Sequence, residues 1–289
     1  MNIRRDRVGL GWRPDLAASI FDHLECIDLL EVIADDFFDG SRHERRALRA
    51  LSSQVTVVLH GIGLGLASCE SVQTTRLDKM ARLFDEVRPE FWSEHLAFVR
   101  AGGVEIGHLA APPRTLQNVE GAAENLCRAI SRVGSKPLME NIATLVDPPG
   151  STLAEPAWVS AILEASDCDS LLDLHNVHAN ALNHGYDATK YLKQIPSSRV
   201  RAIHIAGGKL ITAADGTTRL LDDHLHDVPD PVFELLEEIA ASSPQPLTVI
   251  LERDGAYPPM PQLLAQIQRA RLSLERGRAR HTAPEKCIA

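Results

Sequence analysis

The stretch SLLDLHNVHANALNHGYDATKYLKQIPSSRVRAIHI, residues 170–205, decides how the rest of the chain is interpreted. Its two ends, SLLDLHN (170–176) and RVRAIHI (199–205), are apolar runs of strand length. Near-continuous apolar runs are typical of parallel strands that are buried on both faces. The amphipathic segment DATKYLKQI (187–195) lies between them, so we interpret the stretch as a strand–helix–strand unit.

The same alternation continues along the whole chain. Further strands are predicted at 8–12, 27–33, 55–60, 90–96, 136–142 and 247–253, and further helices at 14–25, 41–53, 72–88, 115–133, 156–166, 229–242 and 258–276. Eight strands alternating with eight helices predict an α/β fold, a single xylose-isomerase-like (β/α)8 TIM barrel over residues 1–275. A long loop is expected after the seventh strand, at 206–229, and a disordered tail at 276–289.

Composition excludes several classes of partner. The formal charge of −9 over 289 residues argues against binding to nucleic acid or to an anionic membrane. No apolar run approaches the roughly 20 residues of a membrane span, and the amino terminus lacks the apolar core of a signal peptide. The five cysteines contain no CxxC pair and are odd in number. We therefore expect neither a disulfide framework nor a cysteine-ligated zinc site, and place the protein in a reducing bacterial cytoplasm.

Polar residues collect where the predicted strands end, which in a TIM barrel is the catalytic face. The strand ends carry His60, Glu94, His95, Glu140, Asn141, Asp173, His175, Asn176, His204, Glu252 and Asp254, and the long loop adds Asp222, Asp223, His224 and His226. Any one of these is more often a cap or a hydrogen-bond anchor than a ligand. Six successive strand ends must converge on one mouth, however, and a cation relieves the repulsion between buried carboxylates. The sequence therefore predicts a metal centre.

The types of donor atom limit which metals the site is expected to bind. Imidazoles and carboxylates without cysteine suit iron, manganese or zinc, and their number exceeds the needs of one ion, so two or three bridged ions are expected. Asp173 is predicted to face the barrel, with Asn176 and His178 on a loop above it. Three other interpretations remain: a divalent-metal sugar isomerase or phosphodiesterase-type hydrolase, a non-catalytic metal-binding protein, and a nuclease fragment, although the last lacks its ββα context.

At these residues the sequence resembles a known family, the multinuclear non-heme iron-dependent oxidative enzymes (MNIO), formerly a domain of unknown function that includes methanobactin-type enzymes. The resemblance covers nearly the whole chain and is most specific in LHGIGLGL, SEHLAF, DLHNVHANALNHG, IHIAGG, LLDDHLHDVPDPVF and LERD. It implies the metal ligands His60, His95, Glu140, Asp173, Asn176, His204, Asp222, His224 and Glu252. Within this set it implies catalytic roles for Glu140, Asp173 and His224.

The resemblance also implies a reaction. Relatives hold two or three irons in a mixed Fe(II)/Fe(III) state and use O2 as cosubstrate. They oxidise ribosomally made precursor peptides (RiPP biosynthesis), commonly at cysteine to give oxazolone and thioamide groups, thiazole-like rings or carbon excision, and in one branch at a C-terminal aspartate. Many form a heterodimer with a small partner protein that binds the leader peptide.

Four positions beside the site depart from the usual pattern of the relatives. DVNNVYVN is DLHNVHAN in this chain, so His175 and His178 replace an Asn and a Tyr. AGH is AGG, so Gly208 stands in place of a histidine, and Arg253 replaces an aromatic residue. We expect His175, His178 and Arg253 to line an altered substrate pocket, with Arg253 meeting a substrate carboxylate or pairing with Asp254 or Asp223.

Overall fold

The structure is a computed structural model that describes residues 5–282, apart from 213 and 215. Within these residues, eight parallel strands close into a barrel in the order β1-β12-β9-β8-β7-β4-β3-β2, and β1 pairs with both β2 and β12. The barrel strands are β1 (Arg7–Gly11), β2 (Leu29–Ile33), β3 (Thr56–Gly61), β4 (Trp92–His95), β7 (Leu138–Glu140), β8 (Asp169–Asp173), β9 (Val200–Ile205) and β12 (Thr248–Leu251). The predicted TIM barrel is confirmed.

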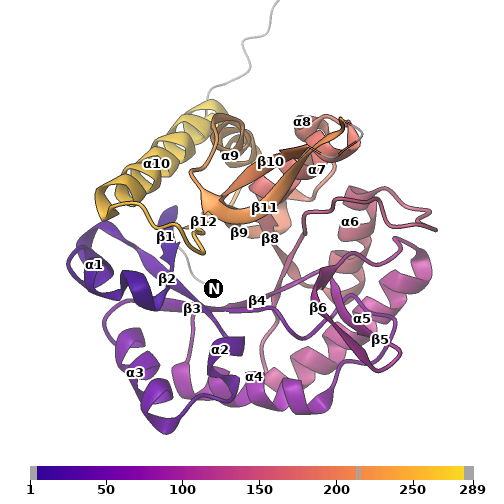
Figure 1. Cartoon of the computed structure of the whole chain (residues 1–289), viewed down its shortest axis with the longest axis horizontal. Coiled ribbons are helices and arrows are strands. Elements are labelled where there is room, and N and C mark those ends of the chain that lie inside the picture. Colours follow the sequence, from indigo (N-terminus) through magenta and orange to yellow (C-terminus); the bar gives the residue numbers. More distant parts are fainter. Residues whose placement is uncertain (1–4, 213, 215, 283–289) are drawn as a thin grey trace, which may run out of the picture.

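Helices form an outer ring around these strands (Figure 1). They are α1 (Ala17–Phe21), α2 (Asp35–Phe38), α3 (Arg42–Ser52), α4 (Thr74–Val87), α5 (Leu116–Val133), α6 (Glu155–Ser166), α7 (Leu174–His184), α8 (Ala188–Leu192), α9 (Asp230–Ser242) and α10 (Met260–Thr282), with 3-10 turns at Pro14–Leu16, Leu24–Cys26 and Ser197–Arg199. Local sequence sets several ends: Ser41 and Glu44 form a capping box that starts α3, and Gly134 ends α5 with φ 78°. None of the described helices has the length and apolar character needed to cross a membrane.

The last helix corrects the predicted start of the tail. Residues 276–282 continue α10, where the sequence predicted a disordered tail from 276. The helix persists because its polar side chains find partners: Arg276 Nε donates to Glu237 of α9 at 2.6 Å, and Arg278 Nε donates to Asp6 at 2.9 Å. The remaining residues of the predicted tail, 283–289, lie outside the described residues.

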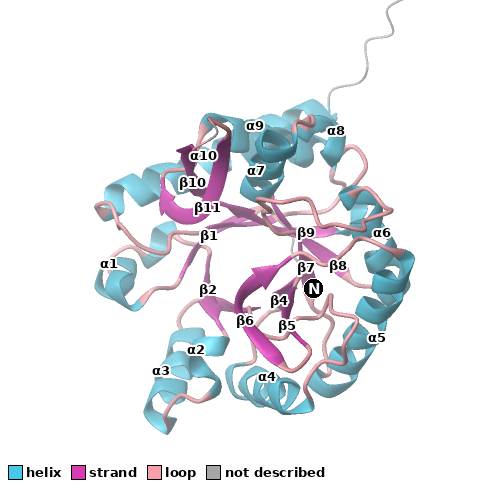
Figure 2. Ribbon diagram, turned by 45° about the vertical axis from the view of Figure 1, so that its right-hand side comes forward, coloured by secondary structure: helices cyan, strands magenta, loops and turns pink. Residues whose placement is uncertain are grey.

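Two β-hairpins stand outside the barrel, after the carboxyl ends of β4 and β9 (Figure 2). The first pairs β5 (Phe98–Ala101) with β6 (Val104–Ala110) and was not predicted. The second pairs β10 (Gly207–Thr212) with β11 (Thr218–His226) and occupies most of the segment expected to be a loop. The long insertion predicted after the seventh strand is confirmed, and it is a paired hairpin, because a hairpin ladder satisfies the backbone of a polar segment without requiring a buried apolar face.

The barrel interior is built in layers. Alternate residues of each strand point inward, and one inward layer is apolar and buried: Leu29, Val58, Phe91, Leu138, Leu171, Ala202 and Ile250. The intervening residues, such as Leu30, Leu59 and Leu172, belong to the large core between the strands and the helices. The apolar layer closes the barrel from below, and the next inward position on each strand lies toward the carboxyl-end mouth.

Candidate metal centre

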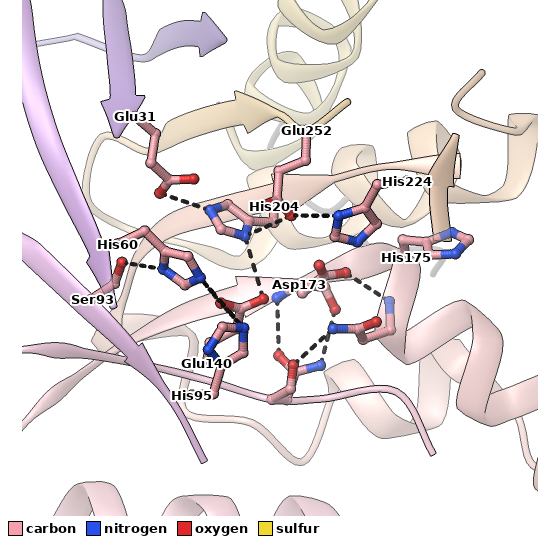
Figure 3. A network of polar contacts seen from close by, with 12 residues as sticks. Glu31, His60, Ser93, His95, Glu140, Asp173, His175, His204, His224 and Glu252 are labelled. Atoms are coloured by element: carbon pink, nitrogen blue, oxygen red, sulfur yellow. Dashed lines mark hydrogen bonds and ion pairs between the residues drawn. The ribbon is translucent and has the colours of Figure 1, made fainter. Parts of the chain in front are cut away.

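The next inward layer is almost entirely ionisable (Figure 3). Two residues beyond the apolar layer the strands place Glu31, His60, Glu140, Asp173, His204 and Glu252. Each of these residues is at most 4% exposed. The layer exists because residues two apart in a strand share a face, so an apolar floor and a polar layer follow from one alternation.

Three of the predicted ligands form a first cluster. His60 Nε2 lies 3.3 Å from His95 Nε2, and each of these nitrogens lies 3.4 Å from Glu140 Oε2. Atoms spaced in this way can all lie about 2 Å from one point, the usual bond length from zinc or a similar ion to nitrogen and oxygen. Ser93 Oγ at 2.8 Å and the Gly61 carbonyl at 3.2 Å contact the Nδ1 atoms of His60 and His95, which orients both rings.

A second cluster shares Glu140 with the first. It consists of Glu140, Asp173, His204 and Glu252, whose donor atoms all lie within 4.8 Å of one another. His204 Nδ1 lies 3.3 Å from Glu140 Oε1 and 3.0 Å from Glu252 Oε2. Glu140 therefore presents Oε2 to the first cluster and Oε1 to the second, which is the arrangement of a carboxylate that bridges two ions.

Asp173 both starts α7 and faces the second cluster. Its Oδ1 accepts from the backbone N–H of Asn176 at 2.6 Å, while its Oδ2 is buried and has no hydrogen-bond partner among the residues that the structure describes. Asn141 holds the same junction, since it accepts from Asp173 N at 2.9 Å and donates to Asp173 O at 3.0 Å. Because Asp173 is the N-cap, the chain turns directly into a helix, and the predicted loop position of Asn176 and His178 is wrong.

The hairpin contributes two further predicted ligands. Asp222 Oδ1 and His224 Nε2 on β11 approach to 2.7 Å. His224 has φ 52°, a left-handed conformation that is unfavourable for a bulky residue and is often found at functional sites. Its Nδ1 contacts Asp254 Oδ2 at 3.1 Å, and Arg13 Nε donates to Asp254 Oδ1 at 3.0 Å. Asp254 thus links the hairpin to the barrel mouth.

The charges in the centre are unbalanced when no cation is present. Burial lowers the pKa of His60 well below its usual value. Burial, reinforced by the Glu140 charge, raises the pKa of Asp173 well above that of an ordinary carboxyl. His204 is also buried, but Glu252, Glu31 and Glu140 outweigh that burial and raise its pKa. These shifts show that the carboxylates of the centre favour a positive charge among them, which a proton or a metal ion can supply.

Unpartnered polar atoms test whether metal ions fit. Within residues 5–282, the buried atoms that lack a hydrogen-bond partner include Glu31 Oε1, Glu140 Oε2, Asp173 Oδ2, Asn176 Oδ1, His204 Nδ1, Asp222 Oδ1, His224 Nε2 and Glu252 Oε2. Each such atom costs about 1–3 kcal/mol if it stays unsatisfied. Imidazole nitrogens and carboxylate oxygens are donors that first-row divalent metals accept. The residues therefore fit a multinuclear metal centre.

Glu31 is the member of this layer that sequence reasoning missed. Its Oε2 lies 2.9 Å from Nε2 of His204, and burial raises its pKa. It was missed because it lies in the middle of the run LLEVI and not at its end. Counting inward positions from Leu29 finds it, since residues 29 and 31 of one strand share a face.

The three residues predicted to line a substrate pocket have different environments. His175 is fully buried on α7, and burial lowers its pKa to about 4. His178 lies one turn further along α7 and is half-buried. Arg253 donates to the Gly255 carbonyl at 2.8 Å and lies 3.3 Å from Asp227, so the expected pairing with Asp254 or Asp223 is wrong. Its guanidinium holds the loop after β12.

A cavity of about 590 Å3 opens beside the centre. Its lining comes from the end of β6 (108–111), the loop after β7 (143–149) and residues 220–222 of β11. Most of this lining is apolar, whereas Asp222 of the centre forms part of its wall. The two hairpins therefore help to build a largely apolar approach to the metal ligands.

Comparisons with solved structures show the fold. The chain is similar to an L-ribulose 3-epimerase, with a TM-score of 0.61 and 14% identity over 97% of this chain and 99% of the other. It is equally similar to a xylose isomerase domain-containing protein of Salmonella typhimurium, with a TM-score of 0.61 and 14% identity over 95% and 99% of the two chains. These similarities confirm a xylose-isomerase-like TIM barrel.

Sequence comparisons show the family. The chain is 33% identical to a UPF0276 protein of Rhizorhabdus wittichii over 92% of this chain and 94% of that protein. It is also 33% identical to one of Streptomyces avermitilis, over 81% of this chain and 48% of that longer protein. Residues 7–275 match the family described as RiPP precursor modification enzyme MbnB/TglH/ChrH. The chain therefore belongs to this family of enzymes that modify ribosomally made precursor peptides.

Proposed function

We propose that this chain is an O2-dependent oxidative enzyme with two or three non-heme irons that modifies a ribosomally synthesised precursor peptide. The observation that carries the proposal is the pair of clusters joined by Glu140. Within the described residues, four buried donor atoms of these clusters lack a hydrogen-bond partner: Glu140 Oε2, Asp173 Oδ2, His204 Nδ1 and Glu252 Oε2. Such a donor set, with a bridging carboxylate and no thiolate, suits iron.

The residues divide into three groups of ligands. His60, His95 and Glu140 would hold one ion, and Glu140, Asp173, His204 and Glu252 would hold a second. Asp222 and His224 would hold a third, with Asn176 as a further donor near Asp173. Iron bound in mixed Fe(II)/Fe(III) states supplies one-electron chemistry with O2, and the protein supplies geometry and protons.

The contacts indicate which nitrogen atoms in the clusters carry protons. Glu31 accepts from Nε2 of His204, which leaves Nδ1 directed at the carboxylates of Glu140 and Glu252. Although burial opposes its charge, His95 has its pKa raised to about 9 by Glu140 and Glu94. A metal ion that binds at neutral pH would therefore displace a proton from His95. The affinity of the site for metal should fall as the solution becomes more acidic.

The approach to the centre supports a peptide substrate. The cavity beside Asp222 has about 590 Å3 of space and walls that include Leu145, Val146 and Pro148. A segment of a few residues fits this volume, with an oxidisable cysteine or a C-terminal aspartate presented to the metals. His175, His178 and Arg253 remain predicted contacts of the substrate.

A small protein that binds the leader peptide is the proposed partner. Apolar side chains on the β10–β11 hairpin are exposed, including Leu210 at 62% and Leu225 at 38%. Exposed apolar residues beside a substrate entrance suit a transient protein contact. The relatives are bacterial, and the described cysteines, Cys26, Cys69, Cys127 and Cys168, are free, so we propose a bacterial cytoplasmic location.

The test is co-expression with each neighbouring short open reading frame, followed by mass spectrometry of the peptide and iron analysis of the protein. We expect a defined mass change that requires iron and air and is lost in Glu140→Gln. Glu90→Gln is the matched control, because Glu90 pairs with Arg7 at the opposite end of the barrel. Metal-dependent turnover of a sugar without O2 would instead favour an isomerase, and a protein that holds no metal would refute the proposal.

A further inference from the structure

A second cavity, of about 520 Å3, lies among helices of the outer ring. Its walls come from Arg114 before α5, the start of α6, the end of α7 and α8. Helices α6 and α8 are neighbours in the ring (Figure 1). The lining residues include no proposed metal ligand, so this cavity is separate from the metal centre.

Arg114 is a buried cation whose hydrogen bonds are incomplete. It is 9% exposed, and its backbone is fixed because N donates to Ser151 Oγ at 3.1 Å and O accepts from Leu153 N at 3.0 Å. Its Nη2 donates to Asp147, whereas its buried Nε has no hydrogen-bond partner among the described residues. A carboxylate can bind Nε and Nη2 together through its two oxygens, so Asp147 uses only half of this fork.

Asp147 is a partner that a ligand can replace. Its side chain is 63% exposed, and an ion pair with so exposed a carboxylate contributes little to stability because water competes for it. A ligand carboxylate that binds both Nε and Nη2 of Arg114 makes one more charge-assisted hydrogen bond than Asp147 does. Leu145, Val146 and Pro148 of the same loop line the cavity beside the metal centre, so the two cavities share this loop.

The rest of the wall suits an apolar group. The rings of Tyr186 and Tyr191 stack with their centroids 5.9 Å apart and an angle of 15° between their planes. Ala154 and Pro156 also line the cavity. Aromatic and aliphatic surfaces of this kind bind the apolar part of a ligand, while a few polar groups fix its orientation.

The other ionisable groups around the cavity permit an anion. Lys190 is an exposed cation, and Oδ1 of Asp187 accepts from the first backbone N–H groups of α8. Glu155 accepts from Tyr191 Oη at 3.2 Å, and burial raises the pKa of Glu155 to about 7, so much of this carboxyl is uncharged at neutral pH. Burial also lowers the pKa of His184, which keeps that ring neutral.

We propose that this cavity binds a carboxylate with an apolar body, which is either a free organic acid or the carboxyl terminus of a peptide. The carboxylate replaces Asp147 on Nε and Nη2 of Arg114, and the apolar body lies against Tyr186 and Tyr191. The inference does not depend on the proposed metal function, because it concerns other residues.

Calorimetric titration of the metal-free protein with N-acetyl-phenylalanine tests the site, and the uncharged amide of this compound is the matched ligand control. We expect the acid to bind and the amide to bind at least about tenfold more weakly, because the charge-assisted hydrogen bonds to Arg114 are lost. Arg114→Met should weaken binding of the acid to a similar extent. The matched control is Arg132→Met, which removes an exposed ion pair with Asp78 and should bind the acid like the wild type.

Asp147→Asn gives a change of the opposite sign. It removes the carboxylate that competes for Arg114, so this variant should bind the acid several-fold more tightly than the wild type. A purely structural role of the Arg114–Asp147 pair would not produce that gain. Because the Asp147 side chain is mostly exposed, the variant should fold, and it decides the question even if Arg114→Met does not fold.

Several results would overturn the inference: an acid that does not bind at millimolar concentration, an acid that binds no better than its amide, or Asp147→Asn that binds the acid no more tightly than the wild type. An acetylated tetrapeptide of three alanines and a terminal phenylalanine distinguishes the two sources. Tighter binding than that of N-acetyl-phenylalanine indicates a peptide terminus, and equal or weaker binding indicates a free acid. Arg114→Met should load iron like the wild type, so failure of the metal function and failure of this site are separate results.

Discussion

Replacing Glu31 with glutamine tests whether a side chain that contacts a proposed ligand raises the affinity of the centre for metal. Glu31 Oε2 lies 2.9 Å from His204 Nε2, and the opposite nitrogen, Nδ1, faces Glu140 and Glu252. A carboxylate behind a histidine fixes its tautomer and makes the ring a better donor to metal. Glutamine keeps the shape and an acceptor oxygen and removes the charge.

The magnitude follows from this one contact. A hydrogen bond to a charged group contributes about 1.5–3 kcal/mol, against about 1 kcal/mol for a neutral pair, so the substitution loses about 0.5–2 kcal/mol, with a central value of about 1.3 kcal/mol. Since about 1.4 kcal/mol corresponds to a factor of ten, the affinity of the second cluster should fall about tenfold. The first cluster, which contains His60 and His95, should keep its affinity.

Chelator competition measures the result. Metal-free Glu31→Gln and wild type are titrated with Fe(II) without oxygen, in the presence of a chelator of known affinity. One class of site should weaken about tenfold, and Glu90→Gln should match the wild type. Equal affinities at every site in Glu31→Gln would show that Glu31 does not act through His204, and loss of all sites would show a general disruption of the barrel.

Three further predictions concern stability, each measured by urea unfolding of the metal-free protein. Burial raises the pKa of Glu155 to about 7 from 4.5, so the folded state keeps this proton while the unfolded state loses it, and stability should fall as pH rises from about 4.5 to 7. Glu155→Gln should remove that fall and should be more stable than the wild type at pH 8. The difference should be at most about 3 kcal/mol, because the residue is only half-buried. Parallel curves of stability against pH for the two proteins would contradict this prediction. Asn141→Ala removes both backbone bonds to Asp173 and should cost about 2–4 kcal/mol, whereas a loss below about 1 kcal/mol would mean that water replaces the amide. Leu171→Ala opens a cavity in the apolar floor and should cost about 2–5 kcal/mol, and an unchanged midpoint would show that the floor repacks.

The barrel was predictable because its strands have a strong and regular signal. Runs such as RVRAIHI and LTVILER are buried on both faces, and the helices between them carry clear caps and periodicity. The β5–β6 hairpin was missed because β5 is only four residues long and β6 is largely exposed, so neither shows the buried apolar run that marks a barrel strand. Their formation depends on pairing with each other, which a pattern of burial does not record.

The site was predictable where a ligand ends a strand and hidden where it does not. His60, Glu140 and Asp173 follow apolar runs directly, so reading the last residue of each run finds them. Glu31 lies inside its run, and the orientation of His175 depends on where α7 begins and on the space at Gly208. The roles of Glu31 and His175 depend on tertiary packing, which cannot be read from a single sequence.

The layered barrel has a consequence for how the protein is made. Its inner ligands extend along the chain from Glu31 on β2 to Glu252, directly after β12, and Glu140 at the middle contacts both clusters. An incomplete chain on the ribosome lacks the last strand, so it cannot close the barrel or present the second cluster. The metal proposed for the second cluster would therefore enter only after synthesis is complete and the barrel has closed.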